Sequence, residues 1–282
     1  MYRLCCILNY LQLDFISHMN INELFSVEGK VAVVTGGSKG IGKMIATGLA
    51  MNGAKVYITA RHGSTLQKTQ SELLEKYNAD VYTIPCDLST QDGIDALYKE
   101  VCARENGIDI LVNNAGVAGG EDFDLFSESS WDTVMDLNVK SIFFLTQKFK
   151  KLLKTNATSN DPSRVVNIGS VAGIVNPGID TYAYSTSKAA VHHLTRSLAG
   201  RLVKENILVN AIAPGPYPSD LLGPAIGFNY SMVEEANPRG RIGTLEDISG
   251  LVIFLCSRAG AFTVGETITS DGGITKTMEH WK

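Results

Sequence analysis

A tyrosine and a lysine, Tyr184 and Lys188, stand four residues apart in the segment Tyr-Ser-Thr-Ser-Lys, inside a stretch with a helical pattern. Positions i and i+4 of a helix share one face, so the phenol and the ammonium can point into the same cleft. A phenol titrates near about 10 and a neighbouring positive charge favours the phenolate, so the pair predicts a pKa of Tyr184 closer to the working pH. Such a tyrosine can give a proton to a forming alkoxide or take one in the reverse direction. Tyr182 cannot play this part, because Thr186 stands four residues after it.

A serine precedes this pair and follows an apolar run. Ser170 comes directly after the segment 164–168 and Gly169. Its hydroxyl can hold the oxygen of a substrate carbonyl. A Tyr-x-x-x-Lys pattern alone is common and mostly structural, so a catalytic interpretation depends on what the rest of the chain places beside it.

A glycine-rich segment, Thr-Gly-Gly-Ser-Lys-Gly-Ile-Gly at 35–42, follows a predicted strand and opens a predicted helix. Glycines let the backbone turn tightly and approach a pyrophosphate, while the free N–H groups at the helix start attract its charge. The spacing differs from the commoner Gly-x-Gly-x-x-Gly, and a purely structural turn is the alternative interpretation. The candidate cofactor-binding residues in this turn are Gly36, Ser38, Lys39, Gly40, Ile41 and Gly42.

The end of the second predicted strand indicates which nicotinamide cofactor fits. The acid that binds the ribose hydroxyl of NAD is expected about 20 residues beyond the turn. Ala60 and Arg61 stand there instead, and no Asp or Glu occurs from 43 to 71. Arg61 and Lys39 can both pair with a 2′-phosphate, which favours NADP(H). The alternative is that both are solvated surface cations.

Two further loops follow predicted strands, at the edge where open α/β sheets bind ligands. A carboxylate in the first loop can accept from an adenine amino group, and small residues in the second let a flat ring pass close to the backbone. Asn113 is either part of that site or a structural tie between strands. The candidate cofactor residues in the two loops are Asp87, Leu88, Asn114, Ala115 and Gly116.

The elements that would position these residues alternate along the chain. Most of the strand candidates lack polar alternation, which is typical of burial on both faces of a parallel sheet. The sequence therefore predicts an α/β fold, a doubly wound (Rossmann) parallel sheet of seven strands in a three-layer α/β/α sandwich. The strands are predicted at 30–35, 55–59, 80–85, 110–113, 164–168, 207–212 and 266–269. The helices are predicted at 41–51, 64–77, 93–105, 129–154, 183–202 and 245–256.

The composition excludes several classes of protein. A hydrophobic content of 44% and a charged content of 19% are those of a globular chain, and the net charge of -4 argues against a nucleic-acid partner. No run approaches the roughly 18 to 20 apolar residues of a membrane span. The five cysteines show no CxxC spacing, so we expect no metal site and a reducing compartment, the cytoplasm.

The first eighteen residues are apolar and precede a second methionine, Met19. A signal peptide or organelle presequence is one interpretation, but the charged region is poor and no small-residue cleavage site follows. The others are a disordered or docked extension, or an upstream start that is not used. We expect an N-terminal extension at 1–19 and one folded domain at 20–282.

These motifs, in this order, resemble those of the short-chain dehydrogenase/reductase family, and the match runs from about Phe25 to Gly273. The resemblance implies that Tyr184 is the general acid/base and that Ser170 orients the carbonyl. It implies that Lys188 lowers the pKa of Tyr184 and binds the nicotinamide ribose, so the two also count as cofactor-binding residues. Asn138 matches the asparagine that anchors a proton-relay water.

The resemblance extends to the cofactor loop after the sixth strand. It implies that Pro214 and Gly215 lie beside the nicotinamide carboxamide. The usual threonine is replaced there by Ser219, which keeps a hydroxyl. Pro216 and Pro218 remove two backbone donors, so contacts in this loop depart from the family pattern.

The sequence predicts an NADPH-dependent reductase that acts on a ketone or β-keto carbonyl, as in the carbonyl and 3-oxoacyl reductases of the family. An NAD(P)-dependent polyol or alcohol dehydrogenase is one alternative, and a catalytically idle dinucleotide sensor or scaffold is another. The apolar segment 217–237, with Leu221, Ile226 and Phe228, is a lid over the substrate or a loop packed on the body. The family implies a homodimer or homotetramer.

Overall fold

Seven strands form one sheet in the computed structural model, which describes residues 20–219, 222–225, 227 and 229–277. Every neighbouring pair of strands is parallel, so the predicted sheet is confirmed. The strands are β1 (Val31–Thr35), β2 (Lys55–Ala60), β3 (Val81–Pro85), β4 (Ile110–Asn113), β5 (Ser163–Ile168), β6 (Ile207–Pro214) and β7 (Thr267–Ser270).

The strand order β3-β2-β1-β4-β5-β6-β7 reverses direction beside β1. β1 pairs with β2 on one side and with β4 on the other, so the chain winds outward in both directions from this point. The loops that follow β1 and β4 therefore diverge at their carboxyl ends, where doubly wound sheets bind ligands. The glycine-rich turn follows β1, and the loop that contains Asn114 follows β4.

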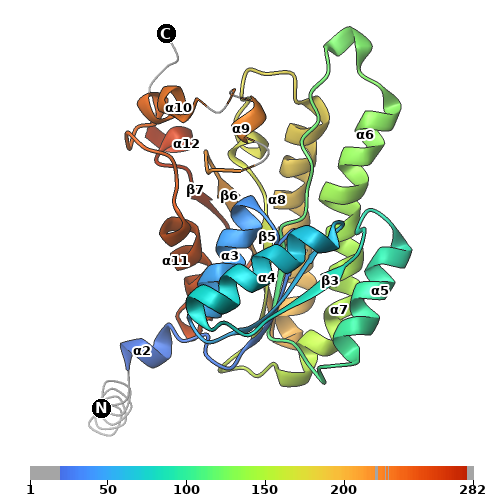
Figure 1. Ribbon diagram of the computed structural model, residues 1–282, viewed down its shortest axis with the longest axis vertical. Coiled ribbons are helices and arrows are strands. Elements are labelled where there is room, and N and C mark those ends of the chain that lie inside the picture. The colour runs from blue at the N-terminus through green and yellow to red at the C-terminus, as the bar shows by residue number, and fades with distance from the viewer. Residues whose placement is uncertain (1–19, 220–221, 226, 228, 278–282) are drawn as a thin grey trace, which may run out of the picture.

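Helices cover both faces of the sheet (Figure 1). Ala32 and Val34 belong to one buried cluster and Val33 to the other, because successive side chains of a strand point to opposite faces. The first layer contains α3 (Gly40–Met51), α4 (Gly63–Tyr77) and α11 (Leu245–Cys256). The second contains α5 (Gln91–Cys102), α7 (Ser141–Asn156) and α8 (Tyr182–Leu202).

The long helix predicted at 129–154 is wrong in one respect, since it is interrupted. The chain forms α6 (Glu128–Met135), then a π-helical turn, η2 (Asp136–Lys140), and only then α7. One extra residue in a turn rotates the side chains that follow it, and such turns occur often at functional sites. Asn138 lies in the middle of this turn and is fully buried.

The remaining elements are short, and two of them lie in the segment 217–237, which is therefore not a plain loop. Leu221, Ile226 and Phe228, predicted to belong to a lid, lie outside the described residues, as does the predicted extension 1–19. No helix in the described part of the chain is long and apolar enough to cross a bilayer. The short helices are α2 (Ile21–Leu24), η1 (Phe123–Leu125), η3 (Val171–Gly173), η4 (Val203–Glu205), α9 (Leu222–Ala225), α10 (Tyr230–Ala236), η5 (Arg258–Gly260) and α12 (Ile274–Thr277).

Candidate active site

The glycine-rich turn after β1 requires glycine at several positions. Gly36 and Gly40 have φ values of 66° and 50°, in the left-handed region that side chains with a Cβ rarely adopt. A Cβ on Gly42 would lie 2.3 Å from the carbonyl oxygen of Gly36, so the helix start packs directly on the turn. Ser38 is buried, and Lys39 occupies the N-cap position of α3. The turn thus brings bare backbone and the positive end of α3 together, which is the shape and charge that a pyrophosphate needs.

The loop after β4 braces this turn from the side. The Thr35 hydroxyl accepts hydrogen bonds from the backbone N–H groups of Asn114 (2.8 Å) and Ala115 (2.9 Å). The Asn114 amide donates to the carbonyl oxygens of Thr35 (2.8 Å) and Gly36 (3.3 Å). Asn114, predicted to bind the cofactor, therefore holds the turn in place with its side chain. Thr35 is a site residue that the sequence reading left out of the cofactor set.

Asn113, for which the sequence left two roles open, is a structural tie. Its amide donates to Asn167 Oδ1 (2.8 Å) and Thr146 Oγ1 (3.3 Å), and Asn167 in turn donates to Thr195 (2.9 Å). This buried polar chain joins β4 and β5 to α7 and α8 below the site.

The loop after β6 reaches the glycine turn from the opposite side. A Cβ on Gly40 would lie 3.1 Å from Cβ of Ser219, so the two segments are in close contact. The Ser219 hydroxyl accepts from the backbone N–H of Leu222 (3.1 Å), at the start of α9. Pro214 ends β6, and a Cβ on Gly215 would come within 2.8 Å of Asp271. Glycine is therefore required at Gly215 for β6 and β7 to lie this close at their ends.

Two of the predicted cofactor residues, Arg61 and Asp87, follow β2 and β3. Both are exposed, whereas Leu88 is buried. Asp87 Oδ1 accepts from the Ser89 backbone N–H (3.0 Å) and hydroxyl (2.8 Å). These hydrogen bonds, together with the positive charge of Arg61, lower the pKa of Asp87. The carboxylate is thus held ionised beside an exposed guanidinium, an arrangement that suits recognition of adenosine and a nearby phosphate.

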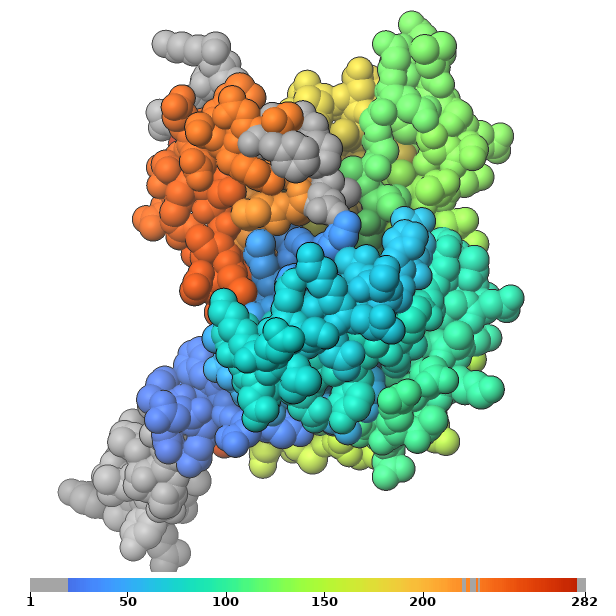
Figure 2. Space-filling view, in the orientation of Figure 1, coloured from blue at the N-terminus to red at the C-terminus, as the bar shows by residue number. Residues whose placement is uncertain are grey.

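The glycine turn and the loops after β4 and β6 meet on one face of the molecule (Figure 2). In that view the blue segment of the turn lies between the orange segment after β6 and the green segment after β4. Gly116 lies close to the reactive residues, because a Cβ on it would come 3.0 Å from Asn138 Oδ1 and 3.7 Å from Lys188 Nζ. Bare backbone, a helix start and exposed cations on one edge fit a phosphorylated dinucleotide.

The Tyr184 phenol and the Ser170 hydroxyl are hydrogen-bonded to each other. Ser170 is 9% exposed, and its hydroxyl also accepts from the backbone N–H of Ala172 (3.1 Å). Burial raises the pKa of Tyr184, and the hydrogen bond with Ser170 lowers it in part. The predicted lowering by Lys188 is therefore wrong, because the loss of solvent disfavours the phenolate and the ammonium does not compensate.

Lys188 is buried one turn after Tyr184, with 5% of its surface exposed. Its ammonium lies 5.6 Å from the centroid of the Tyr184 ring and donates to the carbonyl oxygen of Ile168 (2.9 Å), at the end of β5. Burial lowers the pKa of Lys188 to about 8. The i, i+4 placement predicted from the sequence is confirmed, but the ammonium faces the ring and β5 rather than the phenol oxygen.

Asn138 is clamped by the loop after β4 and by α8. Its Oδ1 accepts from the Val117 backbone N–H (2.9 Å), and its Nδ2 donates to the Val117 carbonyl (2.9 Å) and to the Ser187 hydroxyl (3.0 Å). Ser187 in turn donates to the carbonyl oxygen of Tyr184 (2.7 Å). The π turn thus links the predicted water anchor to the helix that carries the acid. Ser187 lay within the quoted motif, but nothing in the sequence marked it as a partner of Asn138.

All four predicted catalytic residues, Asn138, Ser170, Tyr184 and Lys188, are thereby connected through direct contacts or one intervening residue. Across the described residues, no three His, Cys, Asp or Glu side chains gather as a metal ion would require. The site offers a phenol acid, a hydroxyl and an ammonium beside a cradle for a dinucleotide.

Comparison with known proteins gives the same picture. The family model described as Enoyl-(Acyl carrier protein) reductase matches residues 36–275. The chain is 43% identical over 251 residues to the 3-oxoacyl-acyl-carrier-protein reductase of rhamnolipid biosynthesis from Pseudomonas aeruginosa, covering 88% of this chain and 97% of that protein. It is 37% identical over 254 residues to the 2-dehydro-3-deoxy-D-gluconate 5-dehydrogenase of Escherichia coli, covering 88% and 96%.

A solved structure agrees with the fold as well. The Pseudomonas aeruginosa RhlG/NADP active-site complex superimposes with a TM-score of 0.85 at 42% identity, covering 91% of this chain and all of that one. The chain therefore belongs to the short-chain dehydrogenase/reductase family of oxidoreductases.

Proposed function

We propose that this protein is an NADPH-dependent reductase that converts a ketone or β-keto carbonyl to an alcohol. The observation that carries the proposal is the hydrogen-bonded pair of Tyr184 and Ser170, with Lys188 buried one turn away, at the sheet edge that also carries the glycine turn. The similar 3-oxoacyl reductase and the NADP complex support both the reaction and the cofactor.

The cofactor would lie across the carboxyl ends of β1, β4 and β6. The turn at 36–42 would hold its pyrophosphate, and Arg61 with Lys39 would face its 2′-phosphate. Asp87 and Leu88 would contact the adenine ring, and the backbone at 114–116 would lie against the adenosine half of the cofactor. Pro214, Gly215 and Ser219 would border the nicotinamide.

The bound nicotinamide supplies the hydride, and the chain supplies everything else. The Ser170 hydroxyl holds the carbonyl oxygen, and the Tyr184 phenol gives that oxygen a proton as negative charge develops on it. Because burial raises the pKa of Tyr184, the phenol keeps its proton until the oxygen becomes basic. A protonated phenol is the form that carbonyl reduction requires.

The proton lost by Tyr184 is replaced through Lys188 and Asn138. Lys188 Nζ and Asn138 Oδ1 lie on the same side of Gly116, 3.7 Å and 3.0 Å from where a Cβ on this glycine would be, so a water bound between the two groups would bridge them. Asn138 Oδ1 has accepted one hydrogen bond from Val117 and keeps a second lone pair for such a water. The ribose of the cofactor would bind the remaining donors of Lys188.

The direct test is Tyr184→Phe, assayed by NADPH oxidation against a panel of simple ketones, β-ketoesters and oxidised sugars. We expect kcat to fall by about a thousandfold or more with NADPH affinity within about twofold, because only the proton donor is lost. Tyr182→Phe is the matched control, since Tyr182 starts the same helix and its hydroxyl bonds Asp180 (2.7 Å) outside the set. Normal turnover by Tyr184→Phe would remove the assignment.

The cofactor assignment is tested separately with Arg61→Asp. An acid at this position would repel a 2′-phosphate and accept from a ribose hydroxyl, so the ratio of kcat/KM for NADPH to that for NADH should fall by at least about tenfold. Arg258→Asp, an exposed arginine in η5, controls for the change in net charge. An unchanged ratio would remove Arg61 from the site.

A second candidate is an NAD(P)-dependent dehydrogenase that oxidises a polyol or sugar-derived alcohol, favoured by the similarity to the 2-dehydro-3-deoxy-D-gluconate 5-dehydrogenase. It predicts faster turnover of alcohols than of ketones at neutral pH. An idle dinucleotide sensor predicts NADPH binding with no turnover of either class, although a binding module needs no acid pair. The same panel, run in both directions, separates the three.

We further propose a homodimer or homotetramer in the cytoplasm. Helices α7 and α8 lie side by side on one face and are the natural pairing surface. Light scattering after size exclusion measures the subunit number, and a monomer at micromolar concentration would contradict this proposal. Fractionation of cells that express the full chain tests the compartment.

A further inference from the structure

His192 lies directly behind the reactive set, one helical turn after Lys188 on α8. The side chain is 6% exposed, although no step of the proposed reaction uses it. Its Nε2 atom faces the backbone N–H of Ser170 at 3.5 Å, a long hydrogen bond at the very residue that holds the carbonyl. A buried, titratable ring so close to the site calls for a physical explanation.

Two glycines allow the ring to sit there. A Cβ on Gly169 would lie 2.1 Å from His192 Nε2, and a Cβ on Gly173 would lie 2.9 Å from His192 Cε1. These glycines flank the segment 170–172, which leaves β5 and turns through η3. The backbone on both sides of Ser170 therefore rests on the imidazole, which acts as a wedge between this turn and α8.

The protonation state of the ring matches this position. Burial, together with the positive charges of Lys188 and Arg196, lowers the pKa of His192 to about 4, while a backbone hydrogen bond with Gly173 raises it in part. At neutral pH the imidazole is uncharged, with its proton on one nitrogen and a lone pair on the other. Only the neutral ring can accept from the N–H of Ser170.

We propose that His192 is a positioning residue. It fixes the position and orientation of the Ser170 hydroxyl, because it supports the 169–173 turn and accepts a hydrogen bond from the Ser170 backbone N–H. The ring touches neither substrate nor cofactor and acts through Ser170 alone. This inference rests on the proposed function, because the role of Ser170 in holding the carbonyl is part of it. It adds a residue that the Tyr, Lys, Ser and Asn set does not include.

The test is a double-mutant cycle with ethyl acetoacetate and NADPH as the probe pair. In His192→Leu we expect kcat to fall by about tenfold or more, with NADPH affinity within about twofold, because a small displacement of a positioned group is costly. In a Ser170→Ala background the same change should cost less than about twofold, because the residue it positions is gone. An equal loss in both backgrounds would overturn the proposal, as would a large loss of NADPH affinity.

A pair of polar variants tests the hydrogen bond apart from packing. His192→Gln can place an acceptor near the Nε2 position, whereas His192→Asn is too short to reach it, so Gln should retain about fivefold more kcat than Asn. Equal activity of the two would reduce His192 to a space-filling residue. Circular dichroism and melting temperature identify any variant that does not fold, and the Gln and Asn pair then carries the test if Leu does not fold.

Different results would contradict the proposed function and the positioning role of His192. If Ser170→Ala keeps the kcat of the unmodified protein, or if that protein reduces no ketone, the proposed function fails. If Ser170→Ala is impaired and His192→Leu is not, only the positioning role fails. Crystal structures of His192→Leu and the unmodified protein give a readout without turnover: a Ser170 Oγ atom in the same place in both would contradict the proposal.

Discussion

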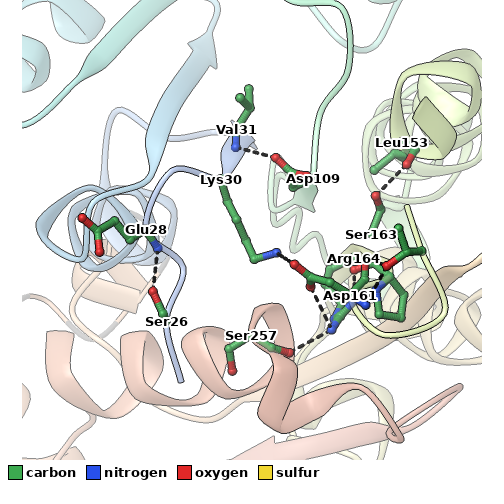
Figure 3. Close-up of polar contacts among 12 residues, drawn as sticks. Ser26, Glu28, Lys30, Val31, Asp109, Leu153, Asp161, Ser163, Arg164 and Ser257 are labelled. Carbon is green, nitrogen blue, oxygen red and sulfur yellow. Dashed lines mark hydrogen bonds and ion pairs between the residues drawn. The ribbon is translucent and has the colours of Figure 1, made fainter. Parts of the chain in front are cut away.

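A buried cation lies at each end of strand β5, Arg164 of the strand itself and Lys188 of α8, and the two are built into the fold in different ways. At the amino end, the Arg164 side chain is 1% exposed and donates to the carbonyl oxygens of Leu255 (3.0 Å) and Pro162. It also donates to the carbonyl oxygen of Ser257 (2.8 Å; Figure 3). At the carboxyl end, the Lys188 ammonium makes one hydrogen bond to a described residue, the carbonyl of Ile168. The Arg164 guanidinium therefore has three carbonyl acceptors among the described residues, whereas the Lys188 ammonium has one.

The acceptors explain the difference. Leu255 and Ser257 belong to the C-terminal end of α11, where unpaired carbonyls and the negative end of the helix dipole favour a cation. Asp161 adds a carboxylate 4.0 Å from Arg164 and pairs with Lys30 at 2.7 Å. Arg164 therefore ties β5 to α11 and serves the fold. Lys188 has three donors, one of which is bonded to a described residue, and this suits a group that also binds a ligand.

Lys188→Met gives the largest expected effect. We expect kcat to fall by about a thousandfold or more, because the phenol loses its proton relay and the ribose loses a donor. The free energy of unfolding should hold steady or rise, since a buried and poorly paired charge is removed. Both are measured on one preparation, by NADPH oxidation and by urea denaturation. Lys151→Met, an exposed change on α7, is the control. A large loss of stability would mean that Lys188, like Arg164, has a structural role.

Arg164→Met should show the opposite pattern. Removing the guanidinium leaves three carbonyl oxygens without their donor in a buried place, so the free energy of unfolding should drop by about 3 to 5 kcal/mol. The kcat of the folded fraction should stay within about twofold, because the opposite end of the strand holds the site. A thousandfold loss of kcat in soluble, folded Arg164→Met would contradict a purely structural role for Arg164.

Most of the fold could be predicted from the sequence because β1 to β7 are short apolar runs separated by helical patterns. β1 and β3 begin one residue later than predicted, and β6 runs on to Pro214 instead of stopping at Ile212. The π turn at Asn138 was missed, because one extra residue hardly disturbs the helical periodicity over a long apolar segment. That small error is the one that decides where the Asn138 amide points.

The proximity of the candidate residues Tyr184, Lys188 and Ser170 was also predictable, since they stand in fixed order along the chain. Their electrostatics were not. The pKa of Tyr184 depends on burial and on the Ser170 hydroxyl, which spacing does not reveal. Arg164 was predicted as an ordinary strand residue, because two of its acceptors lie 91 and 93 residues away. His192 carried no signal, since its partners are backbone groups.

The pH dependence of the free energy of unfolding also distinguishes Lys188 from Arg164. The pKa of Lys188 is about 8 in the folded protein against 10.5 as its ordinary value, so between these pH values the unfolded chain binds more protons than the folded one. The free energy of unfolding should therefore rise with pH across that window, by at most about 3 kcal/mol from this group. Arg164 stays charged in both states and contributes no such slope.

The measurement is the difference in stability between the unmodified protein and Lys188→Met at pH 7, 8, 9 and 10. Subtraction removes the contribution of other groups that titrate in this range. We expect the unmodified protein to become more stable relative to Lys188→Met as the pH rises. A difference that is flat over this range would mean that Lys188 has an ordinary pKa when buried, and that its ammonium has acceptors beyond Ile168.

Asp161→Asn should have the smallest effect and decides what holds Arg164. The Asp161 side chain is 43% exposed, so its ion pair with Lys30 is screened by solvent and should contribute about 1 kcal/mol or less to the free energy of unfolding. If the backbone carbonyls of α11 are the main partners of Arg164, Asp161→Asn lowers the free energy of unfolding far less than Arg164→Met does. Added salt then reduces the difference in stability between Asp161→Asn and the unmodified protein. If Asp161→Asn costs as much as Arg164→Met, the carboxylate is the true counter-ion. Arg164 would then depend on an ion pair with Asp161 at the amino end of β5, and not on the backbone carbonyls of α11.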